Sequence, residues 1–129
     1  LEALADPNEI GEYTFGLNGE IIDPRPVFTS LLADLRAGVS MSSLSARFHN
    51  SLARLCAETC AVITKESGIR VVALSGGVWQ NRLLFERTLP LLQGQGYTVL
   101  THTQLPPNDG CIGLGQAAVA AELHQHGSI

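Results

Sequence analysis

Residues Val71 to Asn81 read VVALSGGVWQN, and this stretch decides the fold that we expect. Four apolar residues run into Ser75, Gly76 and Gly77, after which a helical pattern begins. A strand that leads through two glycines into a helix leaves bare backbone N–H groups beside the positive end of the helix dipole, which suits a phosphate or a carboxylate. The spacing matches neither G-x-G-x-x-G nor the P-loop, so a plain structural turn stays the alternative.

The composition indicates one globular domain. The 129 residues are 45% hydrophobic and 16% charged, which is enough apolar material for a core and too little charge for a disordered segment. A net charge of −4, with no cluster of Lys and Arg, argues against a nucleic-acid partner. No apolar run approaches about 20 residues, so we expect no membrane span. The chain opens on Leu1 and resembles the middle of a longer sequence, so we expect a fragment of a multidomain protein.

The three cysteines indicate a reducing compartment, and we expect a cytoplasmic protein. Cys56 and Cys60 are four residues apart in a helical pattern and share one face. Two ligands do not complete a zinc site, and no histidine pair stands at finger spacing. We therefore expect Cys56 and Cys60 to be small buried hydrophobic residues.

The first half of the chain predicts a β-hairpin and two helices. Residues 13–17 and 20–23 flank Asn18-Gly19, the strongest two-residue hairpin signal. Prolines then begin a helix that Gly38 ends, and its expected apolar stripe is Val27, Leu31, Leu32 and Leu35. A longer helix is predicted from about Ser42 to Glu66, with Gly68 as its cap. Its apolar stripe has steps of three and four and consists of Leu44, Phe48, Leu52, Leu55, Thr59, Val62 and Ile63.

The second half predicts two strands, each followed by a helix. We expect strands at 70–74 and 97–101 and helices at about 79–93 and 111–125, with Arg82 and Glu86 paired in the first of these helices. The order is ββααβαβα, an α/β fold with helices packed on a mixed sheet, in which the two later strands are parallel neighbours. Ligands collect beyond the carboxyl ends of such strands, so the loops at 75–78 and 106–110 should lie side by side.

The second loop carries the candidate for metal chemistry. Pro107-Asn108-Asp109-Gly110 has the composition of a turn, and in the structural interpretation the Asp109 carboxylate caps the last helix. In the functional interpretation, Asp109 faces the crevice and ligates a divalent cation that bridges phosphate oxygens. The residues alone leave both interpretations open.

Three further residues have a structural and a functional interpretation. Trp79 is expected to pack at the start of its helix rather than to cover a nucleotide base. His49 is expected on the flank of the long helix in a structural role, and His102, which follows a strand, is a candidate for lining the crevice together with Ser75.

Two motifs carry a resemblance to a known family. LSGGVWQNRLL (residues 74–84) and THTQLPPNDGCIGLGQAAVAA (residues 101–121) stand in this order after FHNSLA (residues 48–53). With them, nearly the whole chain resembles the C-terminal end of the HypF family, the carbamoyltransferases of NiFe-hydrogenase maturation. The resemblance implies a Kae1-like domain of the actin-like (ASKHA) ATPase superfamily, with two ribonuclease-H-like lobes. Residues 1–129 would form a single domain, the second lobe.

The resemblance also implies roles for individual residues. Gly76, Gly77 and Asn81 match the family's nucleotide-binding Gly-Gly-Val-x-x-Asn motif, with the glycine amides on phosphate and Asn81 on the nucleoside. Asp109 matches the family's metal-ligating aspartate. The family's His-x-x-x-His metal ligands belong to the first lobe and have no match here, because His124 and His126 are only two residues apart.

The resemblance implies an enzyme that moves a carbamoyl group from carbamoyladenylate, made from carbamoyl phosphate and ATP, to the C-terminal cysteine of HypE. No side chain here is a convincing nucleophile, as expected if the thiol arrives on that partner. Two alternatives remain: a tRNA threonylcarbamoyl transferase, which the acidic balance disfavours, and a non-enzymatic nucleotide-binding or interaction lobe. We expect the isolated lobe to be inactive and prone to self-association through an exposed apolar face.

Overall fold

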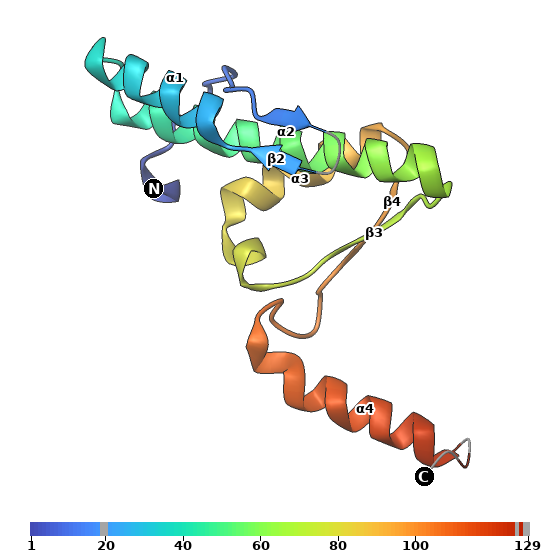
Figure 1. Cartoon of the computed structure of the whole chain (residues 1–129). Coiled ribbons are helices and arrows are strands. Elements are labelled where there is room, and N and C mark those ends of the chain that lie inside the picture. The colour runs from blue at the N-terminus through green and yellow to red at the C-terminus, as the bar shows by residue number, and fades with distance from the viewer. Residues whose placement is uncertain (19–20, 126, 128–129) are drawn as a thin grey trace.

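The computed structural model describes residues 1–18, 21–125 and 127 (Figure 1). Its elements follow the predicted ββααβαβα order, with three short 3-10 turns added. The strands are β1 (Gly16–Asn18), β2 (Ile21–Asp23), β3 (Val71–Leu74) and β4 (Thr98–Thr101). The helices are α1 (Arg25–Arg36), α2 (Met41–Ser67), α3 (Arg82–Gly94) and α4 (Ile112–Gln125). The 3-10 turns are η1 (Glu2–Leu4), η2 (Gly77–Gln80) and η3 (Asp109–Cys111). No helix in these described ranges is long and apolar enough to cross a membrane.

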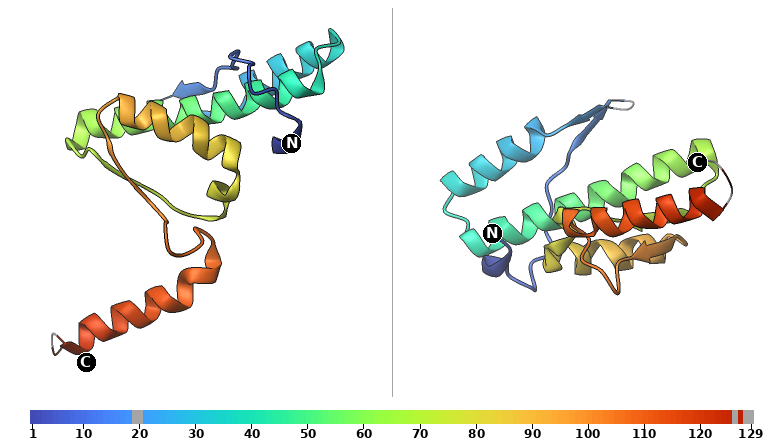
Figure 2. Two further views of the ribbon diagram at one scale, coloured as in Figure 1. Left: turned by 180° about the vertical axis from the view of Figure 1, so that it is seen from behind. Right: turned by 90° about the horizontal axis from the view of Figure 1, so that it is seen from below.

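The strands form two separate sheets, so the prediction of one mixed sheet was wrong for the described residues. β1 pairs with β2 antiparallel, and β3 pairs with β4 parallel. The predicted hairpin and the predicted parallel neighbours are therefore confirmed. Helix α2 lies between the two sheets in the left view of Figure 2, which keeps their strands from pairing.

The hairpin starts later than predicted because Tyr13 belongs to the core. The Tyr13 N–H donates to Ser51 Oγ at 2.7 Å, and the Tyr13 side chain is buried with Val27 and Leu44. Residues 13–15 therefore lead into β1, which begins at Gly16. Asn18 pairs with Ile21, while Gly19 of the predicted turn lies outside the described residues.

The helical stripes were predicted correctly only in part. In α1, Val27 is buried and Leu31 packs beside it, whereas Leu32 and Leu35 are 47% and 46% exposed. In α2, Leu44 is buried, but Val62 and Ile63 near its C-terminal end are about half exposed. An apolar stripe reports which face of a helix prefers cover, and the neighbours in this chain cover only part of each face. Gly68 ends α2 in the left-handed conformation with φ of 73°, as predicted.

The β3–β4 sheet is covered on one face only. Its inner side chains, Val72, Leu74 and Val99, join a core formed with α2 and α3 around Leu92, Tyr97 and Ala57. On the outer face Val71 and Leu100 are each 54% exposed, and Ala73 is exposed too. Parallel sheets in proteins are almost always covered on both faces, so this apolar outer face lacks a layer.

Helix α4 stands apart from the rest of the chain in Figure 1 and in the left view of Figure 2. It contributes no buried residue to the core. Its apolar side chains are open to solvent, namely Ile112, Leu114, Val119 and Leu123. A helix with so many exposed apolar side chains gains little from packing here and is suited to contact a further surface.

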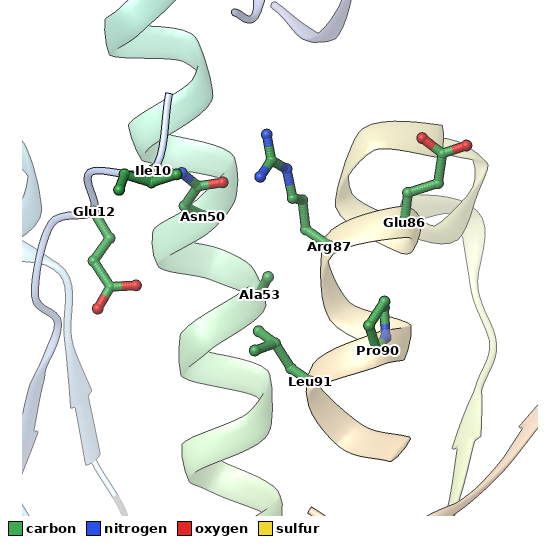
Figure 3. A pocket seen from close by; sticks show the side chains of 8 residues that line it. All are labelled: Ile10, Glu12, Asn50, Ala53, Glu86, Arg87, Pro90 and Leu91. Carbon is green, nitrogen blue, oxygen red and sulfur yellow. The ribbon is translucent and has the colours of Figure 1, made fainter. Parts of the chain in front are cut away.

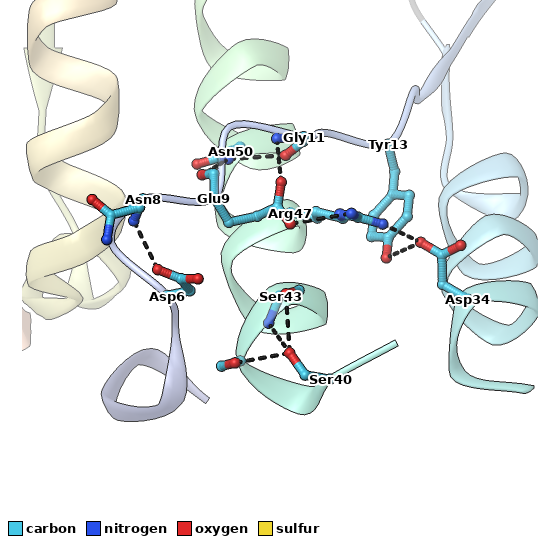
Figure 4. A network of polar contacts seen from close by, with 11 residues as sticks. Asp6, Asn8, Glu9, Gly11, Tyr13, Asp34, Ser40, Ser43, Arg47 and Asn50 are labelled. Atoms are coloured by element: carbon cyan, nitrogen blue, oxygen red, sulfur yellow. Dashed lines mark hydrogen bonds and ion pairs between the residues drawn. The ribbon is translucent and has the colours of Figure 1, made fainter. Parts of the chain in front are cut away.

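A polar network joins the N-terminal segment to α1 and α2 (Figure 4). Arg47 on α2 forms ion pairs with Glu9 at 3.1 Å and with Asp34 at 2.8 Å. The pKa of Glu9 is lowered most by the hydrogen bond from the Gly11 N–H and next by the hydrogen bond from the Arg47 guanidinium. Because the folded pKa of Glu9 is lowered, this stabilisation is present above the ordinary glutamate pKa and is lost as pH falls through the folded value.

Leu92→Ala tests the core under β3 and β4. Leu92 is fully buried, so its truncation leaves a cavity and should lower the free energy of unfolding by about 2–5 kcal/mol. Leu32→Ala is the matched control, since Leu32 is 47% exposed and its truncation should cost far less. Urea denaturation of both variants measures the difference, and equal costs would contradict the assigned core.

Candidate functional site at the carboxyl ends of β3 and β4

The two predicted loops meet at one edge of the β3–β4 sheet. The Gly76 N–H donates to the Pro107 carbonyl at 2.7 Å, which ties the loop after β3 to the loop before α4. A Cβ atom placed on Gly77 would lie 4.0 Å from Cβ of Asn108. The prediction that these loops lie side by side is thus confirmed, and the parallel pairing of Leu74 with Thr101 explains it.

The glycine turn presents open backbone. Gly76 has φ of 99°, a left-handed conformation that glycine adopts without strain, and it leads into η2. The Gly76 N–H is taken by the Pro107 carbonyl, whereas the first two N–H groups of η2, those of Gly77 and Val78, have no partner within that turn and form no such bond to the described residues. No atom lies within 4 Å of a Cβ placed on Gly76, which leaves room for a ligand to approach.

The sequence predicted that the helix after the glycine turn begins at about Trp79. In the structure this helix, α3, begins at Arg82. Residues 77–80 form η2 instead, and the side chain of Asn81 caps α3 by accepting from Leu84 N–H at 2.9 Å. Trp79 packs against the core beneath the sheet, which confirms the structural interpretation of that residue. The predicted pair of Arg82 and Glu86 forms at 2.7 Å.

Asn81 and His49 are joined in a contact that the sequence did not predict. His49 is 3% exposed, so its expected place on the helix flank was wrong, although its structural role is confirmed. Its Nδ1–H donates to the Ser45 carbonyl at 2.7 Å, and its Nε2 accepts from Asn81 Nδ2 at 2.9 Å. The Asn81 amide thus holds α3 and α2 together, and this contact uses one of its two N–H donors.

Asn81→Ala should destabilise the chain more than the loss of an ordinary helix cap. The variant loses the cap of α3, and it leaves the buried Nε2 of His49 without a donor, for a combined cost of about 2–4 kcal/mol. Ser40→Ala is the control, because Ser40 caps α2 from an exposed position and its loss should cost about 1 kcal/mol. Thermal or urea denaturation compares them, and equal costs would argue against the contact with His49.

The structure assigns the cap in the second loop to Asn108 rather than to Asp109. Asn108 Oδ1 accepts from Gly110 N–H at 3.0 Å, and Asp109 lies exposed in η3. The described residues contain no group of three or more His, Cys, Asp or Glu side chains placed to hold a metal ion. Asp109 can therefore offer a cation one carboxylate from this chain, with the other ligands supplied from elsewhere.

Ser75 and His102 come together at the same edge. His102 directly follows β4, and its Nε2 lies 3.0 Å from Ser75 Oγ in the glycine turn. Both side chains are exposed, as a crevice-lining position requires.

The cysteines are free thiols. Cys56 and Cys60 are half-buried, whereas the sequence predicted that both are fully buried. This partial burial raises the pKa of both thiols. Cys111 donates its S–H to the Asn108 carbonyl.

A groove lies away from the glycine turn, between the N-terminal segment, α2 and α3 (Figure 3). Its volume is about 430 Å³, and its floor and walls are Ile10, Glu12, Asn50, Ala53, Glu86, Arg87, Pro90 and Leu91. Its charges already have partners in the chain. Glu86 pairs with Arg82, and Arg87 donates to the Pro7 carbonyl. No sequence pattern predicted this groove, and the groups that line it suggest no chemistry.

Comparison with known proteins identifies the family. Residues 1–116 match the family model described as carbamoyltransferase, Kae1-like domain, second subdomain. The chain is 34% identical to carbamoyltransferase HypF of Synechocystis sp. over 98% of its length, which is 16% of that protein. It is 39% identical to carbamoyltransferase HypF2 of Cupriavidus necator over 81% of its length, which is 12% of that protein.

Two solved structures of HypF proteins also resemble this chain. A full-length HypF in the phosphate- and nucleotide-bound form matches with a TM-score of 0.87 at 35% identity, over 95% of this chain and 20% of that one. HypF of T. kodakarensis matches with a TM-score of 0.80 at 28% identity, over 98% of this chain and 16% of that one. The chain thus spans a fifth or less of the length of these relatives. It belongs to the HypF carbamoyltransferase family and corresponds to the second subdomain of the Kae1-like domain.

Proposed function

We propose that the longer protein containing this chain transfers a carbamoyl group from carbamoyladenylate to the C-terminal cysteine of a HypE-like partner. Carbamoyladenylate would be made from carbamoyl phosphate and ATP, and the product would lead towards the cyanide ligands of the NiFe site. Within that protein, residues 1–129 would act as one lobe of an actin-like (ASKHA) domain. The observation that carries the proposal is the hydrogen bond from Gly76 to Pro107, which joins the glycine turn and the Asp109 loop in one surface.

This surface suits one wall of a nucleotide site. The amides at the start of η2, Gly77 first, would hold phosphate oxygens, and Gly76, whose N–H binds the Pro107 carbonyl, would leave room for the ligand to approach. Asn81 at the end of η2 would lie towards the nucleoside. Asp109 fits a hard divalent cation because its carboxylate is exposed beside the turn and caps no helix. When bound, such a cation would neutralise phosphate charge. Its identity is not fixed by one carboxylate.

The remaining walls would come from the rest of the longer protein. The outer face of β3–β4 and the apolar side chains of α4 are both uncovered, and both belong to segments that adjoin the site. The chain covers only 20% of the full-length HypF that it matches, so a longer protein of that size has further chain that could cover these surfaces. In isolation the same surfaces would favour self-association. We place the protein in the cytoplasm, in keeping with its free thiols.

The test is a transfer assay with the full-length protein, carbamoyl phosphate, ATP, Mg²⁺ and a HypE-like acceptor that ends in cysteine. Mass spectrometry should find one carbamoyl group on the terminal thiol. Modification of tRNA instead would favour a threonylcarbamoyl transferase, which the net charge of −4 argues against. Nucleotide binding without any transfer would support a non-enzymatic lobe.

A further inference from the structure

We propose that His102 is a catalytic residue that takes the proton from the attacking thiol, and that Ser75 is a positioning residue that orients its ring. This inference rests on the proposed function and adds a proton acceptor to it. The starting observation is the 3.0 Å contact between His102 Nε2 and Ser75 Oγ, which spans the carboxyl ends of two strands. The contact joins side chains 27 residues apart in the sequence, at the edge that holds the glycine turn.

The chemistry at this edge requires a base. A free cysteine thiol has a pKa of about 8.5, and the thiolate is the reactive form, so a thiol acceptor is mostly protonated at neutral pH. General bases work best with a pKa near the operating pH, and histidine, at about 6.5, comes closest. The titratable groups on the adjoining loop are Asp109 and Cys111, and the segment from Val71 to Asn81 carries none. Asp109 is the proposed cation ligand, and Cys111 donates its S–H to the backbone.

The contact with Ser75 can set the tautomer of His102. A neutral imidazole has one donor and one acceptor nitrogen. When Nε2–H donates to Ser75 Oγ, Nδ1 carries the lone pair and can accept a proton. Both side chains are exposed, so a thiol carried by another protein can reach the ring.

The step balances without any further reactant. The sulfur attacks the carbamoyl carbon, and an S–C bond forms as the C–O bond to the AMP phosphate breaks. AMP leaves with the electron pair of that bond. The thiol proton passes to His102 Nδ1 and then to solvent, which leaves a thiocarbamate on the partner.

The experiment compares His102→Gln, Ser75→Ala and wild type in the full-length protein. Gln104→Ala, an exposed position in the same loop, is the control and should behave as wild type. His102→Gln should lower the transfer rate at pH 7 by about 10²–10⁴-fold while carbamoyladenylate formation and ATP affinity stay unchanged. The transfer rate of wild type should fall at acidic pH, where a general base becomes protonated, whereas the variant should lack this pH dependence. Ser75→Ala should lower the transfer rate by less than His102→Gln and should keep the fall in rate at acidic pH.

Three outcomes would overturn the inference. Transfer at the wild-type rate and with the wild-type pH profile in His102→Gln would leave the ring without a role. A carbamoyl group found covalently on Ser75 would make that residue a nucleophile rather than a positioning residue. No transfer by wild type to any thiol would overturn the proposed function and this inference together, whereas either of the first two results leaves the proposed function standing.

Discussion

Asp109→Ala in the full-length protein is expected to lower carbamoyl transfer by at least about 100-fold while the fold is retained. The physical reason is that Asp109 is exposed in η3 and caps no helix, so its carboxylate is free to act on a ligand. Substitutions at exposed positions usually change stability by less than about 0.5 kcal/mol. Activity assays and urea denaturation, carried out in parallel, separate the two effects.

Glu66→Ala is the matched control for that experiment, because it removes an exposed carboxylate at the end of α2. It should change neither transfer nor stability. Asn108→Ala should instead lower stability and retain transfer. It removes the hydrogen bond from the Gly110 N–H to Asn108 Oδ1 and keeps the Asp109 carboxylate. Normal transfer by Asp109→Ala would reduce this aspartate to a residue of the turn.

The second large effect is expected when the chain is isolated from the rest of the protein. Residues 1–129 alone should transfer no carbamoyl group and should bind ATP at least about 100-fold more weakly than the full-length protein. Small-ligand sites normally bury most of the ligand, yet Ser75, Gly77 and Asp109 are all exposed here. The chain offers one wall of a cleft and one carboxylate for a cation.

Calorimetry with ATP and Mg²⁺ measures this difference directly, with the full-length protein as the reference. An excess of Mg²⁺ should not rescue binding by the isolated chain, because a cation held by one carboxylate stays labile. Tight, Mg²⁺-dependent binding by the isolated chain, or any carbamoyl transfer from it, would show that the site lies elsewhere.

Local signals in the sequence predicted the elements and their neighbours. The Asn18-Gly19 signal located the hairpin, Gly68 marked the end of α2, and the two later strands paired in parallel as expected. From that pairing followed the meeting of the glycine turn with the loop at Pro107. These features depend on backbone conformation and chain topology, which short stretches of sequence specify well.

Features that depend on distant partners were not predictable in the same way. Leu32 and Val62 continue apolar stripes, but their neighbours in the described chain leave both side chains about half exposed. The bond between His49 and Asn81 joins residues 32 apart, and no local pattern announces it. Asn108 and Asp109 are both acceptable caps by composition, and only the loop geometry assigns the cap to Asn108.

The central claim is that the glycine turn and the Asp109 loop form the phosphate-binding wall of a nucleotide site. Gly77→Val in the full-length protein is the most direct probe. Gly76 is unsuitable, because its φ of 99° would strain any side chain. At Gly77 φ lies outside the left-handed region, and a Cβ would meet only Asn108 Cβ at 4.0 Å, so the added side chain blocks a ligand and spares the fold.

Calorimetric titration of Gly77→Val with ATP and Mg²⁺ is therefore the decisive measurement. Gly94→Ala serves as the control, since a Cβ there meets no atom within 4 Å and the position lies at the end of α3. We expect Gly77→Val to weaken ATP binding by at least about 10-fold, which corresponds to about 1.4 kcal/mol, with an unchanged unfolding transition and with wild-type binding in the control. Wild-type ATP affinity in a folded Gly77→Val protein would contradict the claim.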